Sequence, residues 1–545
     1  ENEDENDDVE EKEDLHQKIT SIINTLTIEE KIGQLFIVGF TGKSIQNTLI
    51  NSINKYHFGN FIYMDENIGT SEELKKLSFD IQSLVLNINK IPAFVAIDHE
   101  GGYVYRLGNN ATHFLGNMAI AATNDPNNAY LVGKAAGREL KNYGINFNFA
   151  PVLDVNNNPH NPVIGIRSFS DNADVVASYG IRMLEGYKEA NVLTSVKHFP
   201  GHGDTTTDSH YGLPKINYGK ECLYEIELKP FIEAINSSVD AIMTAHIIFS
   251  TFDSELPATL SRKVLTNLLR EELGYKGLIV TDEMRMQAIT KYFEGGKAAV
   301  KAIQAGVDLL LYAESTQTSV EAYNSILNAY HNGEISEERI NESVYRILEK
   351  KFKYGLFSND TNESLNDFFN ASKLNHDLIQ ESITIAKGKI NFDKEKSTLI
   401  ISTKASRYPL LPNYSINTNQ NSLAYIGKEY FLKNGVKNVE GIVIDTNVSN
   451  LSNIINLAPN FEQILIAVEN VSINQANLIN QLAKINSNIY VIALRNPYDY
   501  LSYTNINNYI CTYGYFEETV FAILDLFLGK YEAKGKLPVK IEGLN

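Results

Sequence analysis

The chain has no tryptophan, only two cysteines and only 14 prolines among its 545 residues. Without tryptophan, any stacking on a ligand must use the 30 tyrosines and 25 phenylalanines. Cys222 and Cys511 lie far apart in the sequence, so they provide no disulfide framework. The low proline content and the 43% of hydrophobic residues are typical of a folded chain and argue against general disorder.

Long apolar segments and an excess of basic residues are also missing. No hydrophobic run approaches the roughly 18 residues that a membrane-spanning helix needs. Lys and Arg together number 48 against 66 Asp and Glu, and the formal net charge is −18. Because binding to phosphates requires a basic face, this balance argues against a nucleic-acid partner. We therefore expect a large globular protein with neither a membrane span nor a nucleic-acid ligand.

Half of the excess negative charge lies in residues 1–14, which contain ten acidic residues and one lysine. Such a block repels itself, so we predict a disordered acidic tail. The chain begins at Glu1 without an initiator methionine or a hydrophobic signal segment. This fits a spacer after a secretion or lipoprotein signal, and equally an ordinary solvated terminus or a trimmed boundary. We expect a secreted or cell-envelope protein, with a lipid anchor upstream of Glu1 as one means of attachment.

Short apolar runs rich in Ile, Val and Phe alternate with amphipathic helical stretches from about residue 15 to Gly355. The eight runs that we predict as strands are 32–40, 58–64, 91–98, 147–155, 193–199, 241–248, 277–282 and 307–312. Eight strands alternating with helices are typical of a (β/α)₈ TIM-type barrel. In that fold the active site lies at the carboxyl ends of the strands. The polar residues at the end of each run are therefore the candidate site residues.

A smaller alternation of apolar runs and helical segments follows the barrel. Its runs lie at 399–402, 441–445, 464–468, 490–494 and 509–513. They predict a smaller α/β sandwich. We therefore divide the chain into the tail 1–14, a catalytic barrel over 15–357, a linker with a connecting helix over 358–395, and a C-terminal α/β sandwich domain over 396–545. No cluster of ionisable groups closes the later runs, so we expect a stabilising or spacing role for this domain.

Residues 197–210 contain three histidines, two aspartates and one lysine at the predicted catalytic face. A zinc site made from His198, His202, Asp204 and His210 is one interpretation, since imidazoles and carboxylates bind zinc. At other predicted strand ends stand Asp98 with Glu100, and Asp282, and the loops after strands also contain Arg106 and Arg167. Arginines beside zinc would be counterproductive, whereas mixed charges suit a ligand with many hydroxyl groups. We therefore favour a sugar pocket with no metal and no cofactor.

Four motifs stand in order along the predicted barrel: DHEGGYVYR at 98–106, VIGIRSF at 163–169, KHFPGHGDTTTDSH at 197–210, and LS at 260–261 followed by TDEM at 281–284. Together they resemble the β-N-acetylglucosaminidases of glycoside hydrolase family 3. The later α/β unit resembles the second domain of the two-domain Gram-positive members. The KHFPGHG and DSH strings separate this branch from the β-glucosidases, which lack the Asp-Ser-His loop.

The resemblance implies roles for three catalytic residues. Asp282 would be the nucleophile that forms a covalent glycosyl-enzyme, which is retaining chemistry, and a carboxylate suits a positively charged transition state. An isolated aspartate at this position would also fit a helix N-cap. His210 would be the general acid/base, with Asp208 fixing its tautomer and stabilising its charged form.

The resemblance also assigns residues to the sugar hydroxyls and the N-acetyl group. These substrate-binding positions are Asp98, Arg106, Arg167, Lys197 and His198. A structural ring of salt bridges at the barrel mouth is the alternative role for the arginines. Asp154 and His246 are second choices that we expect to be structural or to support the site. His202 and Asp204 are expected to shape the loop.

We therefore predict a monomeric, retaining exo-β-N-acetylglucosaminidase that releases terminal GlcNAc from peptidoglycan-derived GlcNAc-MurNAc fragments or chito-oligosaccharides. Three alternatives stay open. One is a phosphorylase that uses phosphate in place of water, because a neutral histidine base would not repel phosphate. The second is a metal-dependent hydrolase. The third is a non-catalytic surface protein that binds carbohydrate, against which the intact Asp282, Asp208 and His210 argue.

Overall fold

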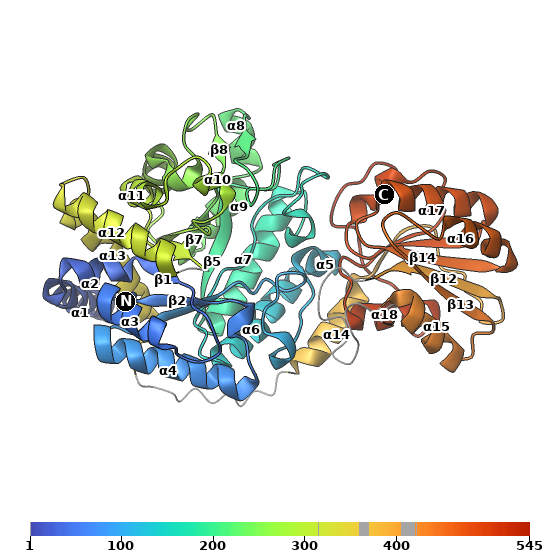
Figure 1. The fold of residues 1–545 in the computed structure, drawn as a ribbon, viewed down its shortest axis with the longest axis horizontal. Coiled ribbons are helices and arrows are strands. Elements are labelled where there is room, and N and C mark those ends of the chain that lie inside the picture. Colours follow the sequence, from blue (N-terminus) through green and yellow to red (C-terminus); the bar gives the residue numbers. More distant parts are fainter. Residues whose placement is uncertain (1, 314–315, 359–369, 405–419, 421, 545) are drawn as a thin grey trace.

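The computed structural model describes residues 2–313, 316–358, 370–404, 420 and 422–544. Two units lie side by side, a barrel surrounded by helices and a smaller sheet with its own helices (Figure 1). Helix α14 (Ala371–Ser382) lies between them. This confirms the predicted fold class, a (β/α)₈ barrel followed by an α/β sandwich.

Eight strands form the barrel sheet within the described residues, in the order β10-β1-β2-β3-β4-β5-β7-β9, and neighbouring strands in this order pair in parallel. A bridge between Val280 and Leu309 brings β9 beside β10, so the sheet is nearly closed. Every residue of these strands is buried, which fits the apolar sequences of β1 and β3, whereas β5 also buries Lys197 and His198 at the cavity end. The strands are β1 (Phe36–Val38), β2 (Asn60–Tyr63), β3 (Phe94–Ile97), β4 (Phe147–Asn148), β5 (Leu193–Phe199), β7 (Ala241–Thr244), β9 (Leu278–Thr281) and β10 (Leu310–Tyr312).

Each predicted run contains one of these strands, and the prediction for β5 matches its bounds. The run 147–155 is much longer than β4, which ends at Asn148. The Asn148 side chain bonds both backbone groups of His99, through Oδ1 at 3.1 Å and Nδ2 at 2.9 Å. Pro151 further on has no N–H to offer a neighbouring strand. After β4 the chain pairs with β5 again only through an isolated bridge between Val152 and Lys197, and it then becomes a loop at the barrel mouth.

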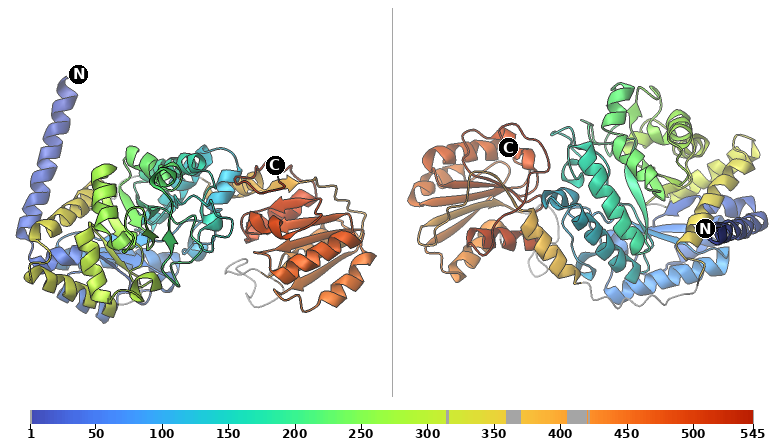
Figure 2. Two further views of the ribbon diagram at one scale, coloured as in Figure 1. Left: turned by 90° about the horizontal axis from the view of Figure 1, so that it is seen from above. Right: turned by 180° about the vertical axis from the view of Figure 1, so that it is seen from behind.

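Helices cover the outside of the barrel sheet (Figures 1 and 2). They are α2 (Ile28–Gln34), α3 (Asn47–Tyr56), α4 (Ser71–Asn89), α5 (Asn117–Ala122), α6 (Asn127–Asn142), α7 (Ala173–Glu189), α8 (Lys220–Glu225), α9 (Lys229–Asn236), a π-helix (Lys263–Glu272), α10 (Gln287–Thr290), α11 (Gly295–Ala305), α12 (Thr316–His331) and α13 (Glu337–Lys353). Two short strands, β6 (Lys215–Ile216) and β8 (Ile248–Phe249), pair with each other outside the barrel sheet. No helix within the described residues combines the length and apolar character needed to cross a membrane.

The N-terminal segment differs from the expected disordered tail. Helix α1 (Asn2–Thr25) begins at Asn2 and projects from the barrel (Figure 2, left), so the described residues 2–14 are helical. Acidic residues are favoured near the N-terminus of a helix by its macrodipole, and glutamate has a high helix propensity. The later turns are anchored, since the His16 ring lies 5.5 Å from that of Tyr345 on α13 and Ile19 is fully buried.

The second unit contains a six-stranded sheet within its described residues, in the order β11-β16-β15-β14-β12-β13. Only β11 is antiparallel to its neighbour. The strands are β11 (Thr384–Lys387), β12 (Thr398–Thr403), β13 (Val439–Ile444), β14 (Gln463–Val468), β15 (Ile489–Ala493) and β16 (Tyr509–Cys511), and the helices are α15 (Leu423–Lys433), α16 (Leu451–Leu457), α17 (Ile473–Ile485) and α18 (Glu517–Phe527).

Strand β11 falls inside 358–395, which we predicted as a linker, yet it pairs with β16. Three of its four residues are half-buried, so this edge strand lacks the apolar run that marked the others. The sheet of the second unit therefore begins before residue 396. Residues 359–369 of the predicted linker lie outside the described residues.

Candidate active site

A cavity of about 200 Å³ lies at the carboxyl ends of the barrel strands. Its lining residues are Asp98, Glu100, Val104, Arg106, Val163, Arg167, Lys197, His198, His202, Ser209, His210 and Asp282. Seven of the eight predicted site residues belong to this set, and the eighth, Asp208, is hydrogen-bonded to His210. The fold therefore gathers side chains from loops that are far apart in the sequence.

Asp282 comes directly after β9 and lines the cavity. Its Oδ1 atom accepts a hydrogen bond from the backbone N–H of Glu283 at 2.7 Å, and its Oδ2 atom lies 4.0 Å from Nε2 of His198. Burial raises the pKa of Asp282, but the imidazoles of His198 and His246, the Glu283 N–H and Lys197 together lower it below its ordinary value. The next helix begins only at Gln287, so Asp282 is not its N-cap. The side chain is an ionised carboxylate facing the cavity.

His198 is held by Asp154, a fully buried carboxylate in the loop after β4. Nδ1 of His198 lies 2.7 Å from Oδ2 of Asp154, and Oδ1 of Asp154 accepts from the backbone N–H groups of His198 at 3.1 Å and His202 at 2.7 Å. Burial raises the pKa of Asp154, whereas the His198 and His202 imidazoles lower it, and the net pKa is lowered. Asp154 therefore supports the site from behind, one of the roles expected for it.

Glu100 is the counter-ion for two cations of the cavity wall. Arg167 donates to it through Nε at 2.9 Å and Nη2 at 2.7 Å, while Nζ of Lys197 lies 2.7 Å from its Oε1. Burial raises the pKa of Glu100, but Arg167 and then Lys197 lower it well below its usual range. A bidentate arginine pair of this kind is rigid as well as strong. The Arg167 fork is thus occupied by protein groups, as the salt-bridge alternative predicted.

Asp98 follows β3 and joins the same network. It accepts from Nζ of Lys197 at 2.9 Å, and its Oδ2 lies 3.9 Å from Nη2 of Arg106. Arg106 also donates from Nη1 to Asp65 at 3.0 Å, while its buried Nε has no hydrogen-bond partner among the described residues. The exposed fraction of the Asp98 side chain is 22%. Asp98 and Arg106 therefore retain capacity to bind hydroxyl groups of a ligand.

His210 and Asp208 form a pair on the loop after β5. Oδ1 of Asp208 accepts from both the backbone N–H and Nδ1 of His210, at 2.9 and 2.7 Å. This contact gives Nδ1 the proton and leaves Nε2 free to exchange a proton with a ligand. The His210 side chain is 55% exposed, whereas that of Asp208 is 20% exposed. The pair has the geometry of an oriented acid/base at the cavity entrance.

The other histidines of the barrel mouth have structural partners. Both ring nitrogens of His202 bond hydroxyls, Nδ1 with Thr205 at 2.8 Å and Nε2 with Ser209 at 2.9 Å. Burial lowers the pKa of His202 to about 4, so this ring is neutral. Its two hydrogen bonds hold the loop after β5 in place. His246 bonds Thr259 and the backbone oxygen of Glu283. Within the described residues, no group of three His, Cys, Asp or Glu side chains is arranged to hold a metal ion.

Glu100 was predicted only as a charged residue of the barrel mouth, with no role in the site, and the lining residues Val104, Val163 and Ser209 were not among the predicted site residues. Glu100 lies inside the 98–106 motif, yet its pairing with Arg167 depends on how the loops after β3 and β4 meet. The spacing of residues along the sequence does not predict the contact between Glu100 and Arg167. Ser209 lies in the sequence between Asp208 and His210, the two residues of the acid/base pair. Its place in the cavity wall could therefore have been predicted from the motif, unlike its hydrogen bond to His202.

Comparison with known proteins finds its family match in the barrel, the part of the chain that contains the cavity. The family model described as "Glycosyl hydrolase family 3 N terminal domain" matches residues 27–350. The chain is 38% identical over 324 residues to Beta-hexosaminidase A of Pseudoalteromonas piscicida, covering 55% of this chain and 54% of that protein. It is 32% identical over 272 residues to a Beta-hexosaminidase of Idiomarina loihiensis, covering 49% of this chain and 80% of that protein.

Among solved structures, a glycoside hydrolase family 3 beta-N-acetylglucosaminidase from Paenibacillus sp. str. FPU-7 is 34% identical, with a TM-score of 0.86. The match covers 95% of this chain and 99% of that one, so the likeness includes the second unit. The chain spans about half the length of the Pseudoalteromonas relative. Together these matches confirm the resemblance found in the four sequence motifs.

Proposed function

The chain belongs to glycoside hydrolase family 3, and from this premise we propose that it is a retaining exo-β-N-acetylglucosaminidase that removes terminal GlcNAc. The observation that carries the proposal is the convergence of Asp282, His210 and an ion-paired cluster on one cavity. An ionised carboxylate and an oriented imidazole are the two groups that a double-displacement glycosidase needs. The names of the similar hexosaminidases support the choice of an amino sugar.

In the first step, a carboxylate oxygen of Asp282 attacks the anomeric carbon and forms an ester bond with the sugar. The glycosidic C–O bond breaks, and the leaving oxygen takes the proton from Nε2 of His210. Asp208 stays hydrogen-bonded to Nδ1 throughout, which holds the ring in orientation. The lowered pKa of Asp282 keeps the nucleophile ionised at neutral pH.

In the second step, Nε2 of His210 accepts a proton from water as the water oxygen attacks the anomeric carbon. The ester bond to Asp282 breaks, which restores the carboxylate and releases GlcNAc. A histidine suits both steps because its ordinary pKa lies close to neutral pH. Nε2 of His198 faces Asp282 at 4.0 Å, so this imidazole lies beside the nucleophile.

The walls of the cavity would hold a single sugar. Asp98 and Arg106 have unused hydrogen-bonding capacity, and Lys197 presents its ammonium group between Asp98 and Glu100. Carboxylates accept from sugar hydroxyls, and cations donate to hydroxyl and N-acetyl oxygens. A small cavity of this kind supports an exo mode of action on one terminal residue. We propose GlcNAc-MurNAc fragments of peptidoglycan as the source, and a secreted or envelope-associated location.

The test is Asp282→Asn, assayed with an aryl β-N-acetylglucosaminide. We expect kcat to fall by about 10⁴-fold or more, because the amide cannot form the glycosyl ester. Asp80→Asn is the matched control, since Asp80 lies on α4 and pairs with the exposed Lys76, away from the cavity. Undiminished turnover by Asp282→Asn would overturn the proposal.

Product analysis separates hydrolysis from phosphorolysis. GlcNAc-MurNAc and chitobiose are incubated with the protein, with and without added phosphate. Free GlcNAc in both conditions supports the proposed hydrolase, whereas GlcNAc-1-phosphate that forms only with phosphate would identify a phosphorylase. Faster release from GlcNAc-MurNAc than from chitobiose supports the muropeptide source, and the reverse order contradicts it.

A further inference from the structure

The loop after β3, residues 98–116, connects the cavity to the second unit. Its Gly101–Val104 segment forms a tight turn in which the backbone N–H of Glu100 donates to Val104 O at 2.8 Å and that of Val104 donates to Gly101 O at 3.1 Å. Glu100 and Val104, at the two ends of this turn, both line the cavity. The side chain of the residue between them, Tyr103, contacts the second unit instead. Any movement of the turn therefore moves the cavity wall.

Tyr103 is held by four groups of the second unit. Its hydroxyl donates to Oε1 of Glu469 at 2.6 Å and accepts from the backbone N–H of Tyr515 at 3.2 Å. The guanidinium of Arg495 lies 4.0 Å from the centre of its ring, and the ring of Phe516 lies 4.9 Å away. Tyr103 is 7% exposed and the Glu469 side chain 4% exposed, so the hydrogen bond between them is shielded from water.

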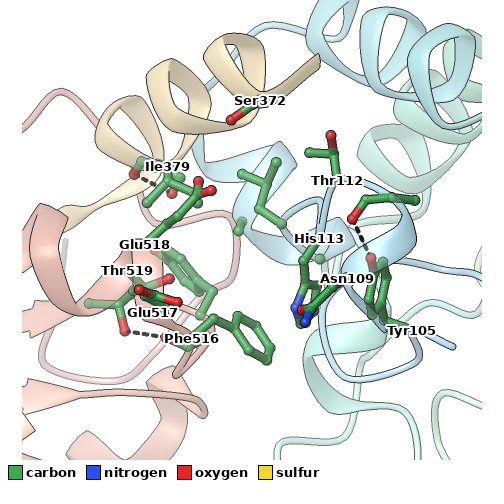
Figure 3. Close-up of a pocket in the computed structure, with 18 of the residues that line it drawn as sticks. Tyr105, Asn109, Thr112, His113, Ser372, Ile379, Phe516, Glu517, Glu518 and Thr519 are labelled. Carbon is green, nitrogen blue, oxygen red and sulfur yellow. Dashed lines mark hydrogen bonds between the residues drawn. The ribbon is translucent and has the colours of Figure 1, made fainter. Parts of the chain in front are cut away.

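A second contact reinforces the same turn. His113 bonds Gly102 O through Nε2 at 2.6 Å, and its ring stacks on Tyr105 at 4.1 Å. The Phe516 ring of the second unit lies 4.4 Å from the His113 ring, and both rings line a cavity of about 460 Å³ together with Tyr105 (Figure 3). The turn is thus held on both sides by contacts that involve the second unit.

We propose that Tyr103 is a positioning residue, through which the second unit fixes the Gly101–Val104 turn and so places Glu100 in the sugar-binding wall. This inference rests on the proposed function. Glu100 compensates Lys197 and Arg167, so a displaced turn would also displace both cations. Asp282 and the His210 pair stand on other loops, so the reacting groups themselves would stay in place. The second unit thereby acts in substrate binding without touching the sugar.

The kinetic test uses Tyr103→Phe and Glu469→Ala in the full 545-residue chain. Both remove the bond between phenol and carboxylate, and we expect KM for the aryl β-N-acetylglucosaminide to rise about tenfold while kcat changes less than about threefold. Glu469→Gln keeps an acceptor oxygen, so it should restore KM to near the parent value. A uniform loss of kcat with unchanged KM, or no rescue by glutamine, would overturn the proposal.

Tyr430→Phe is the matched control. The Tyr430 hydroxyl donates to Asp525 at 2.7 Å within the second unit, so the variant loses the same kind of bond away from the loop after β3. We expect its KM to equal that of the parent. A tenfold rise in KM for Tyr430→Phe would show that any loosening of the second unit has this effect, which contradicts a specific role for Tyr103.

Hydrogen–deuterium exchange makes the test independent of catalysis. Backbone amides of residues 98–107 should exchange faster in Tyr103→Phe than in the parent and in Tyr430→Phe. This readout decides whether the second unit fixes the turn even if the parent hydrolyses no β-N-acetylglucosaminide, a result that would overturn the proposed function alone. Unchanged exchange in Tyr103→Phe overturns the positioning role, whatever the activity.

Discussion

Nδ1 of His198 lies 2.7 Å from Oδ2 of the fully buried Asp154, and this contact orients the ring beside the proposed nucleophile. An ionised carboxylate can only accept hydrogen bonds, so Nδ1 of His198 carries a proton. Nε2 then faces Asp282 at 4.0 Å. The buried pair thus links the loop after β4 to the carboxylate after β9, and it decides which ring nitrogen the nucleophile meets.

Asp154→Asn should lower both activity and stability. The amide keeps the shape but presents one acceptor instead of two, so at least one of the three donors that Asp154 satisfies loses its partner. We expect kcat/KM to fall about 10–100-fold, the loss typical when the hydrogen-bond partner that orients a metal-binding histidine is removed, and the free energy of unfolding to fall by about 1–3 kcal/mol. Steady-state kinetics and urea unfolding measure the two effects.

Asp253→Asn provides the control for Asp154→Asn. Asp253 is also a buried acceptor, bonded to Ser261 and to two backbone N–H groups, but it does not line the cavity. It should lose stability without losing kcat/KM. Equal kcat/KM for Asp154→Asn and the parent would contradict the orienting role of Asp154.

His210→Ala should distinguish substrates by their leaving groups. Protonation of the leaving oxygen contributes about 10²–10⁴-fold in general acid catalysis, so hydrolysis of a GlcNAc disaccharide should fall by that factor. A nitrophenyl glycoside has a leaving group that needs little protonation, so its loss in the first step should be much smaller. His331→Ala, at the exposed end of α12, should change neither substrate. Equal losses on both substrates would argue against His210 as the acid.

Arg167→Lys should weaken the cavity wall. Lysine cannot reproduce the fork that holds both oxygens of Glu100, at 2.9 and 2.7 Å. We expect KM to rise about tenfold and the free energy of unfolding to fall by about 1–3 kcal/mol. Arg182→Lys is the control, because Arg182 pairs with Glu185 on the surface of α7. An unchanged KM in Arg167→Lys would indicate that the fork is irrelevant to binding.

Much of the site could be predicted because its residues close apolar runs. Asp98 and Asp282 directly follow β3 and β9, and Lys197 lies in the last residues of β5. All three line the cavity at the face where barrel enzymes carry their chemistry. Each predicted run contains one barrel strand, and the predicted bounds match those of β5, whose residues are all buried. The local sequence was therefore sufficient to predict a site residue where a buried strand and the functional side chain belong to the same short segment.

The remaining features depend on contacts between distant segments. Glu100 becomes the counter-ion of Arg167 only after the loops after β3 and β4 meet. Strand β11 owes its place to the β16 edge rather than to its own half-exposed residues. The first turns of helix α1 were predicted as a disordered tail, because a block of like charges repels itself. The later turns of the helix pack on α13. These three contacts join segments that are far apart in the sequence, so the spacing of residues does not predict them.

Glu227 should make stability depend on pH. It is 1% exposed, its Oε1 accepts from Asn157 at 3.2 Å, and its buried Oε2 has no hydrogen-bond partner among the described residues. Burial, with a smaller contribution from Asp204, raises its pKa from 4.5 to about 7. The folded state therefore binds this proton more tightly than the unfolded state. The stabilisation is complete below pH 4.5 and is lost as the pH rises through about 7.

Glu227→Gln imitates the protonated carboxyl at every pH, so it should not lose stability through this group. We expect the variant to match the parent in free energy of unfolding near pH 4.5, and to exceed it by about 1–3 kcal/mol at about pH 8. Urea unfolding across this range measures the difference, with the exposed Glu233→Gln on α9 as the control. A difference that stays constant with pH would mean that Glu227 titrates at its ordinary value, because only a raised pKa separates the two proteins above pH 7.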